Sequence, residues 1–328
     1  YERQTPINDT LEYRSPRDSN GHGTHTASTV AGAAVAASSY FGSANGTARG
    51  MAPQARLAIY KVCWGPATYC DGSDIVAAME QAILDGVDII SISITSADDP
   101  FYMDQRAVAA FAAMEKGVFV SSAAGNDGPF SATLSNTAPW VTTVGASSID
   151  RDFPASVVLG NEVIYRGTSM YKGNALQSPF PLVYVSTNNS SRRCLDGSLD
   201  PETVKGKIVV CDQLLIPSHE MDSNALWKGN VVANAGGAGM IVANEEFYGA
   251  QQQLTNPNYL PAISMNFTAG EKIKAYINNT LRNATATMNI TGLTVVGNAT
   301  AAPIVAAFSS RGPSAAYPYI LKPDMIAP

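Results

Sequence analysis

The sequence lacks the features of a nucleic-acid-binding or membrane-spanning protein. Only 15% of its 328 residues are charged, and 21 Lys and Arg against 27 Asp and Glu give a net charge of -6 with no basic cluster. The positive surface that binds nucleic acid is therefore missing. No apolar run approaches the roughly 18 residues that cross a bilayer, and the first residues have neither region of a signal peptide. We expect neither nucleic acid nor a membrane among the partners of this chain.

Cysteine is scarce as well. The chain has four cysteines, and no two of them form the C-x-x-C pair of a structural zinc site. Four cysteines allow three pairings. We favour the pairing in which the turn-forming residues 64–69 bring the first two together, which leaves the other two; an oxidising compartment would support both bonds. The predicted disulfides are Cys63–Cys70 and Cys194–Cys211.

The sequence is instead rich in Asn-x-Ser/Thr sequons. It has nine, five of them in the last quarter of the chain. This density in a chain of low charge is typical of a secreted glycoprotein, whose solubility comes partly from attached sugar. The candidate glycosylation sites are Asn8, Asn45, Asn188, Asn189, Asn266, Asn278, Asn283, Asn289 and Asn298.

Residues 21–145 alternate apolar runs with stretches of small residues. Alternating strands and helices indicate parallel βαβ units and hence a three-layer α/β domain. Ser73 is a suitable N-cap for the first predicted helix. The expected strands are residues 57–62, 87–94, 118–121 and 141–144, and the expected helices are residues 71–85 and 107–116.

The pattern changes after about residue 157. Helical periodicity becomes scarce, and short β-rich runs such as residues 207–210 and 239–242 are separated by loops rich in Asn, Gly and Pro. A length of 328 residues also fits about two domains. We therefore expect an α/β domain at residues 1–163, a β-rich insert at 164–299, and the first domain resumed at 300–328.

Two of the three histidines lie in the segment Gly21-His22-Gly23-Thr24-His25. The glycines allow the backbone to approach another chain closely, and the small residues that follow predict a helix packed under a sheet. We expect the imidazole of His22 to face a cleft and that of His25 to be structural, in the core. Zinc binding of the H-E-x-x-H type fails because a glycine replaces the glutamate and the second histidine comes one residue early. No metal site is predicted.

A second polar candidate follows a predicted strand. In Ser121-Ser122-Ala123-Ala124-Gly125-Asn126-Asp127-Gly128, almost every residue up to Gly125 has a very small side chain. Small residues at the carboxyl end of a parallel strand open a crevice in which ligands bind. The amide of Asn126, projecting into such a crevice, would donate a hydrogen bond to a developing oxyanion.

These two segments, together with Phe308-Ser309-Ser310-Arg311-Gly312-Pro313 and Lys322-Pro323-Asp324, resemble the plant subtilases, the cucumisin-like group of subtilisin-like serine proteases. The resemblance covers essentially the whole chain. It implies a subtilisin-like α/β fold interrupted by a protease-associated (PA) domain at residues 164–299. It also implies that His22 is the general base and Asn126 the side-chain oxyanion donor, in a secreted glycoprotein with disulfides at positions like these.

The resemblance further implies where a substrate binds. An extended peptide would lie along two strand edges and add a strand to them. The substrate-binding residues expected on this basis are Ser93, Ile94, Thr95, Ala124 and Gly125. Thr95 stands where relatives usually have glycine, so the cleavage specificity does not follow from the sequence.

Two triad partners of His22 are missing from the expected positions. Subtilisin-like enzymes order their triad Asp, His, Ser, and we expect both the Asp and the Ser to lie outside these 328 residues. Gly167-Thr168-Ser169-Met170 has the letters of the nucleophile motif, but it lacks the proline and apolar helix that seat a nucleophile. We therefore expect Ser169 not to be catalytic and the fragment alone to be inactive.

The predicted function is that of a secreted serine endopeptidase acting through an Asp-His-Ser triad, located in the apoplast or cell wall. It needs no cofactor. The expected partners are a peptide or protein substrate, the enzyme's own propeptide in the precursor, and a second copy bound through the PA domain. The alternative is a non-catalytic secreted glycoprotein that binds proteins through the PA domain, which loss of the Asp or Ser in the flanking sequence would support.

Overall fold

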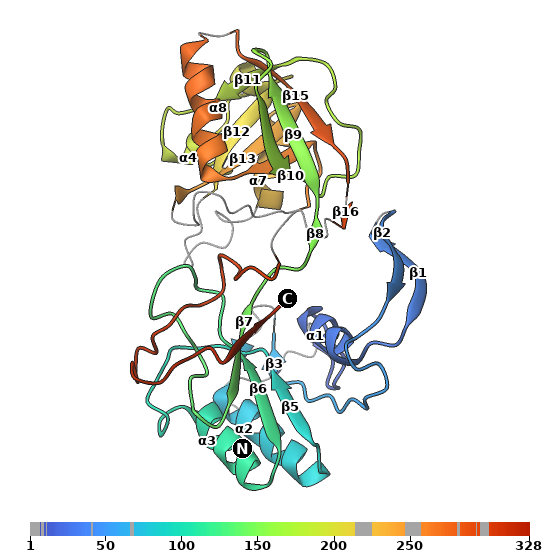
Figure 1. The fold of residues 1–328 in the computed structure, drawn as a ribbon, viewed down its shortest axis with the longest axis vertical. Helices are drawn as coiled ribbons and strands as arrows, with labels where there is room; N and C mark the ends of the chain where they lie inside the picture. Colours follow the sequence, from blue (N-terminus) through green and yellow to red (C-terminus); the bar gives the residue numbers. More distant parts are fainter. Residues whose placement is uncertain are drawn as a thin grey trace. The chain divides into compact units, whose positions relative to one another are not determined.

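The structure, a computed structural model, describes residues 7, 10, 12–40, 42–65, 69–213, 225–246, 257–280, 283–292, 294–295 and 302–328. The chain forms two compact units (Figure 1). The first unit comprises Tyr1–Ser148 and Pro303–Pro328, and the second comprises Ile149–Ala302. The second unit begins ahead of residue 164 because strand β9 (Pro154–Leu159) pairs with β10 (Ile164–Thr168) in the same sheet.

The first unit contains a four-stranded parallel sheet in the order β17-β7-β6-β5. Strand β17 comes from the last residues of the chain and pairs with β7, so the two stretches of the first unit share one sheet. The expected strands at 87–94, 118–121 and 141–144 are confirmed with shifted ends. The strands are β5 (Ile89–Ile92), β6 (Phe119–Ala123), β7 (Thr142–Ala146) and β17 (Met325–Ala327).

Two helices cover one face of this sheet, α2 (Gly72–Asp85) and α3 (Gln105–Glu115). Each begins after an aspartate whose carboxylate accepts a backbone N–H of the first turn, and the cap of α2 is Asp71 instead of the predicted Ser73. Side chains on the other face, including Ile89 and Phe119, are more than half exposed. Among the described residues, the sheet and these helices thus form two of the three expected layers.

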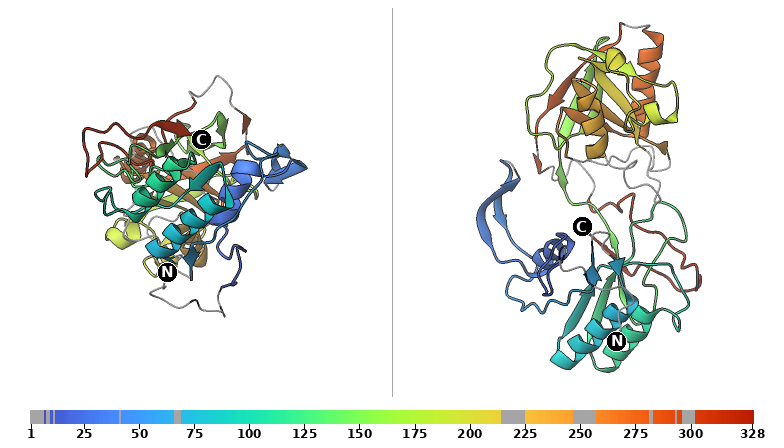
Figure 2. Two further views of the ribbon diagram at one scale, coloured as in Figure 1. Left: turned by 90° about the horizontal axis from the view of Figure 1, so that it is seen from below. Right: turned by 180° about the vertical axis from the view of Figure 1, so that it is seen from behind.

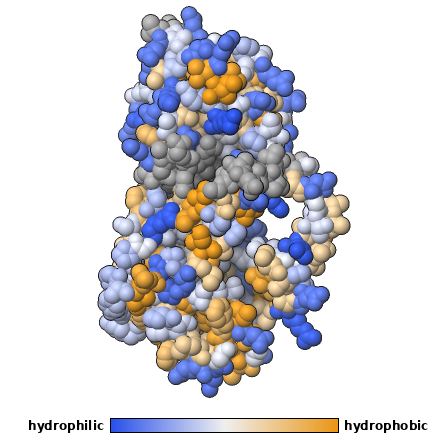
Figure 3. All heavy atoms as spheres, in the orientation of Figure 1, coloured by the Kyte–Doolittle hydropathy of each residue, from blue (hydrophilic) through white to orange (hydrophobic). Residues whose placement is uncertain are grey.

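Apolar side chains are exposed in several places on the first unit, and Figure 3 shows them as separate orange areas in its lower half.

No helix in the described part of the chain is both long and apolar enough to cross a membrane.

The residues ahead of the sheet form short elements. Helix α1 (His22–Ala31) is followed by the antiparallel hairpin of β1 (Val35–Tyr40) and β2 (Ser43–Ala48). The predicted strand at residues 57–62 was wrong: this segment pairs with no other segment that the structure describes, and a strand exists only through backbone pairing. A two-residue hairpin follows, formed by β3 (Cys63–Trp64) and β4 (Tyr69–Cys70).

The second unit is a closed barrel in the order β10-β14-β13-β12-β11-β15-β9. Figure 2 shows this unit from behind in its right-hand view. Strands β11 to β14 run parallel, and β9, β10 and β15 join them antiparallel. The remaining strands are β8 (Arg151–Asp152), β11 (Phe180–Tyr184), β12 (Ile208–Gln213), β13 (Gly239–Asn244), β14 (Ala262–Met265), β15 (Thr285–Ile290) and β16 (Thr294–Val295).

Helices also belong to this unit, although the sequence showed little helical periodicity there. They are α4 (Asn189–Arg192), α5 (Pro201–Val204), α7 (Ala225–Asn234) and α8 (Phe267–Asn279). Helix α7 was not predicted because its buried residues are not all apolar. Lys228 is completely buried, so the usual division into a polar exposed face and an apolar buried face is interrupted. Two apolar clusters, one inside the barrel and one under α7, give the unit a core of its own.

Candidate active site

The predicted substrate-binding residues lie at the carboxyl edge of the parallel sheet. Strands β5 and β6 are neighbours with Ile92 opposite Ser122, so residues 93–95 and 124–125 leave the sheet side by side. Ser93 and Thr95 are exposed, whereas Ile94 packs against the core. This edge is where ligands bind in open α/β sheets.

Asn126 projects from a loop that two distant residues hold in place. The backbone N–H of Ser310 donates to the Gly125 carbonyl over 3.0 Å, and the Asp127 N–H donates to Ser310 Oγ over 3.1 Å. Gly125 has φ +111°, and a Cβ built there would lie 2.5 Å from Ser310 Oγ, so only glycine fits. The Asn126 side chain is exposed, and its amide makes no hydrogen bond within the described residues. The amide is a free donor on a rigid base.

The Phe308–Pro313 motif supports this loop through hydrogen bonds. Ser309 Oγ accepts the Ala146 N–H over 3.0 Å, and the Phe308 carbonyl accepts the Gly128 N–H over 2.9 Å. Both Ser309 and Ser310 are almost completely buried. Sequence reasoning quoted this motif but assigned no role to its serines, because their partners lie more than 150 residues away.

The Lys322-Pro323-Asp324 motif fixes strand β7 beside the same loop. Lys322 Nζ donates to the Val141 carbonyl over 2.6 Å and pairs with the Asp324 carboxylate over 2.7 Å. Asp324 Oδ2 also accepts the Thr143 N–H over 2.7 Å. The motif is therefore structural in this chain.

The turn ahead of His22 is organised by Asp18. One carboxylate oxygen accepts the backbone N–H groups of Asn20 and Gly21, each over 2.8 Å, and the other accepts the N–H and hydroxyl of Thr24, each over 2.7 Å. These bonds, the Gly21 N–H first, hold the pKa of Asp18 far below its usual range. Gly21 adopts φ +107° at the start of α1. The aspartate sets where His22 enters the helix.

No hydrogen bond links His22 to Asn126 in the part of the chain that the structure describes. Within the described residues, no hydrogen bond or ion pair joins α1 to strands β5–β7 or to the Asn126 loop. Both His22 and His25 are exposed, so the expectation that His25 lies in the core was wrong: the C-terminal part of α1 instead bonds to residues 50–52. The hydrogen bonds therefore tie Asn126, but not His22, to the substrate edge in the described part of the chain.

Glu12 joins the His22 region to the hairpin of β3 and β4. It accepts Lys61 Nζ and Ser19 Oγ, both over 2.6 Å, and the Gly65 N–H over 2.8 Å. The hydrogen bond from Lys61, followed by those from Ser19 and Gly65, lowers the pKa of Glu12 to about 2.

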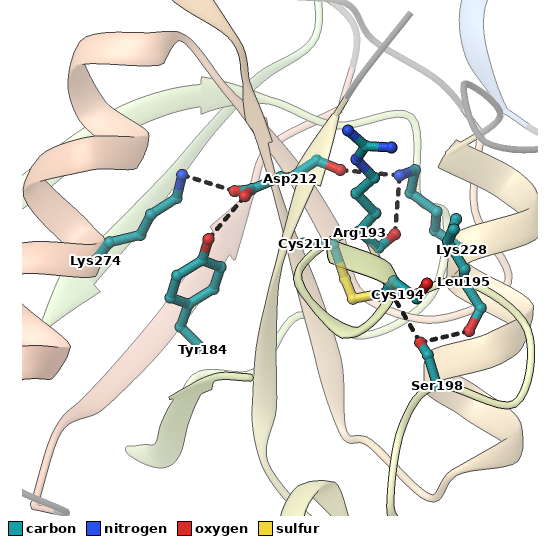
Figure 4. Close-up of a disulfide and its surroundings, with 10 residues drawn as sticks. Tyr184, Arg193, Cys194, Leu195, Ser198, Cys211, Asp212, Lys228 and Lys274 are labelled. Atoms are coloured by element: carbon teal, nitrogen blue, oxygen red, sulfur yellow. Dashed lines mark hydrogen bonds and ion pairs between the residues drawn. A yellow bond between two sulfur atoms is a disulfide. The ribbon is translucent and has the colours of Figure 1, made fainter. Parts of the chain in front are cut away.

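Both predicted disulfides are present, Cys63–Cys70 and Cys194–Cys211. The first closes the β3–β4 hairpin, and the second joins the residues after α4 to β12 (Figure 4). Each lies inside one unit. The described residues contain no group of three or more side chains that could hold a metal ion.

Ser169 is a buried residue of the barrel. Its Oγ donates to the Ala262 carbonyl over 2.6 Å and accepts the Tyr171 N–H over 3.2 Å. Gly167, two residues earlier, allows β10 to approach β14, because a Cβ there would lie 2.5 Å from the Ser264 carbonyl oxygen. The resemblance of residues 167–170 to a nucleophile motif has a packing explanation.

The sequons differ in accessibility. Asn266 is half-buried and caps α8 by accepting the Ala269 N–H over 2.8 Å. Asn8 and Asn298 lie outside the described residues. The exposed sequon asparagines are Asn45, Asn188, Asn189, Asn278, Asn283 and Asn289.

Comparison with known proteins points to one family. A family model described as the subtilase family matches residues 1–328. Two relatives from Arabidopsis thaliana are Subtilisin-like protease SBT1.7, 49% identical over 327 residues, and Subtilisin-like protease SBT1.5, 48% identical over 334 residues. Each alignment covers 98% of this chain and 42% of the relative. The chain spans less than half the length of the curated relatives it matches.

Among solved structures, the psychrophilic subtilisin-like protease Apa1 from Pseudoalteromonas sp. AS-11 aligns with a TM-score of 0.39 and 18% identity. The alignment covers 88% of this chain and 71% of that one. The family assignment rests on the sequence matches alone.

Proposed function

This chain belongs to the subtilase family, and we propose that it is the central part of a plant subtilisin-like serine endopeptidase. In the whole protein a serine outside these residues attacks the peptide carbonyl. His22 takes the serine proton and passes it to the leaving amine, while an aspartate, also outside, orients His22. The 328 residues alone lack a nucleophile and are inert as a peptidase.

The observation that supports this proposal most strongly is the Asn126 loop. Its free amide directly follows residues 124–125 at the carboxyl edge of the sheet, on a backbone fixed by Ser310. A donor held rigidly before the reaction costs no reorganisation when charge develops on the carbonyl oxygen. Asn126 thereby stabilises the tetrahedral intermediate.

The second unit is proposed to be a PA domain inserted in the catalytic domain. The enzyme is proposed to be secreted to the apoplast or cell wall, in agreement with two disulfides and six exposed sequons. Its partners are a peptide or protein substrate, its own propeptide, and a second copy bound through the PA domain.

Substitution of Asn126 in the full-length protein tests this function. Asn126→Ala should lower kcat with little change in KM, because the amide meets charge that is absent from the bound substrate. The scale known for subtilisin itself is a loss of about 10²–10³ in kcat. His22→Ala should cost more, since the base acts in both acylation and deacylation.

Ser169→Ala is the matched control and should leave kcat nearly unchanged. A raised KM with an unaltered kcat in Asn126→Ala would make Asn126 an ordinary substrate contact. Failure of a fluorophosphonate to label any serine of the full-length protein would favour the rival function, a non-catalytic glycoprotein that binds proteins.

A further inference from the structure

Asn136 ties together the two segments that border the substrate edge. It lies between β6 and β7, is 8% exposed and adopts φ +56°. Its Nδ2 donates to the Ile94 carbonyl over 3.0 Å and to the Ala123 carbonyl over 2.8 Å. Both protons of one amide nitrogen are thus used to bridge the segment after β5 and the end of β6.

The neighbours of Asn136 repeat this arrangement. The Ser135 N–H donates to the Ala124 carbonyl over 2.8 Å, and Ser135 Oγ donates to the Ser96 carbonyl. Thr137 Oγ1 donates to Asp98 Oδ1 over 2.7 Å. Residues 135–137 therefore fasten the segment 94–98 along its length.

Other elements of the first unit in turn hold Asn136 and its partner Ile94 in place. The buried Thr143 hydroxyl on β7 donates to the Asn136 carbonyl over 2.6 Å. The Ile94 carbonyl accepts a second bond, over 3.4 Å, from Arg106, which Asp104 holds through two contacts of 3.1 Å. The bridge is anchored to both α3 and β7, so its length cannot relax freely.

The bridge also orients the backbone that a substrate would meet. Successive carbonyls of an extended chain point to opposite sides. Because the Ile94 carbonyl is taken by Asn136, a peptide that added a strand to this segment would pair with the backbone groups of Ser93 and Thr95 instead.

We propose that Asn136 is a positioning residue that fixes the separation of residues 93–95 and 123–125, and so selects the size of the substrate side chain that enters between them. The inference rests on the proposed function. An extended peptide alternates its side chains, so one of them faces the crevice between the two segments. A change of separation there alters the fit of that side chain.

The test compares Asn136→Ala and Asn136→Asp with the wild type in the full-length protein. Neither variant can donate to the two carbonyls, and the aspartate places a carboxylate against them. Asn161→Asp, which makes the same charge change at an exposed turn of the barrel, is the control. Hydrogen exchange of peptides covering residues 93–98 and 121–126 measures the bridge. Hydrolysis of two peptides that differ only in Phe or Ala before the cleaved bond measures selectivity.

Both Asn136 variants should exchange faster in the two segments and change the Phe/Ala ratio of kcat/KM by about tenfold or more, the scale on which pocket fit discriminates apolar side chains. The control should match the wild type. Two results would overturn the positioning role. One is faster hydrogen exchange in the Asn136 variants with an unchanged Phe/Ala ratio of kcat/KM, and the other is hydrogen exchange equal to that of the wild type. Absence of hydrolysis by the wild type would overturn the proposed function together with the selectivity role. Hydrogen exchange would then test only whether Asn136 holds the two segments together.

Discussion

Glu12 shows how much one side chain contributes to the geometry around His22. Its two oxygens accept hydrogen bonds from Ser19, Lys61 and Gly65, which belong to two stretches of chain about 40 residues apart in sequence. These donors bind the ionised carboxylate, which is why the pKa of Glu12 falls from its ordinary 4.5 to about 2. The charge of Glu12 is therefore linked to folding.

The pH dependence of stability should reveal this linkage. A lowered pKa means that the contribution of Glu12 is complete above pH 4.5 and is lost as the pH falls toward about 2. Glu12→Gln should therefore lower the melting temperature most above pH 4.5, and the difference from the wild type should disappear near pH 2. Thermal unfolding of both proteins between pH 2 and 6 measures this.

Glu115→Gln, at an exposed position of α3, is the control and should show no such trend. A difference between Glu12→Gln and the wild type that stays constant over this pH range would contradict the assignment.

At the scale of elements, helix α7 and a disulfide fasten the same two segments. Lys228 Nζ on α7 donates over 2.8 Å to the carbonyls of Arg193 and Asp212, the residues next to Cys194 and Cys211 (Figure 4). Lys228 has no exposed surface. Burial of an amino group this deeply is costly unless hydrogen bonds replace those of water, and the two carbonyls supply such bonds.

The two restraints should therefore be coupled in a double-mutant cycle. Lys228→Met leaves the two carbonyls without this donor and should cost about 1–3 kcal/mol. Loss of the disulfide in Cys194→Ser with Cys211→Ser should cost about 3 kcal/mol, as expected for a loop of this length. Because either restraint alone still holds the segments, the combined loss should exceed the sum by about 0.5 kcal/mol or more.

Urea unfolding of the second unit measures the three free energies. As a control, Lys272→Met should add to the disulfide loss without coupling, since Lys272 is exposed on α8. Strict additivity of Lys228→Met and the cysteine pair would show that the two restraints act on separate parts of the unit.

At the scale of the whole molecule, each unit has its own apolar core and its own disulfide. Residues such as Val157, Ile241 and Met288 fill the barrel, whereas Ile75 and Ala113 belong to the core under α2 and α3. Cores that do not depend on each other allow separate folding.

Residues 149–302 produced alone should therefore fold. The piece should show near-ultraviolet circular dichroism, form the Cys194–Cys211 bond under oxidising conditions and unfold in one cooperative step. Calorimetry and non-reducing peptide mapping measure these properties. Val157→Asp, which buries a charge in the barrel, is the control that should abolish the transition. A wild-type piece without a cooperative transition would show that the barrel depends on the first unit.

The sequence determined features that depend on neighbours along the chain. Strands β5, β6 and β7 and helices α2 and α3 were predictable because hydrophobic periodicity is local. The disulfides join cysteines only 7 and 17 residues apart. The amide of Asn126 was identifiable from the small residues before it and from the family resemblance.

Tertiary structure alone decided what holds that amide. Ser310 meets Asp127 across 183 positions, and Asn136 meets Ile94 across 42. It also decided that residues 57–62 form no strand, that α1 exposes both histidines, and that β9 closes a barrel with β15. Hydrogen bonds between distant residues leave no periodic pattern in the sequence, because each partner needs only one suitable donor or acceptor at one position. Whether such hydrogen bonds form depends on how the folded chain brings distant segments together.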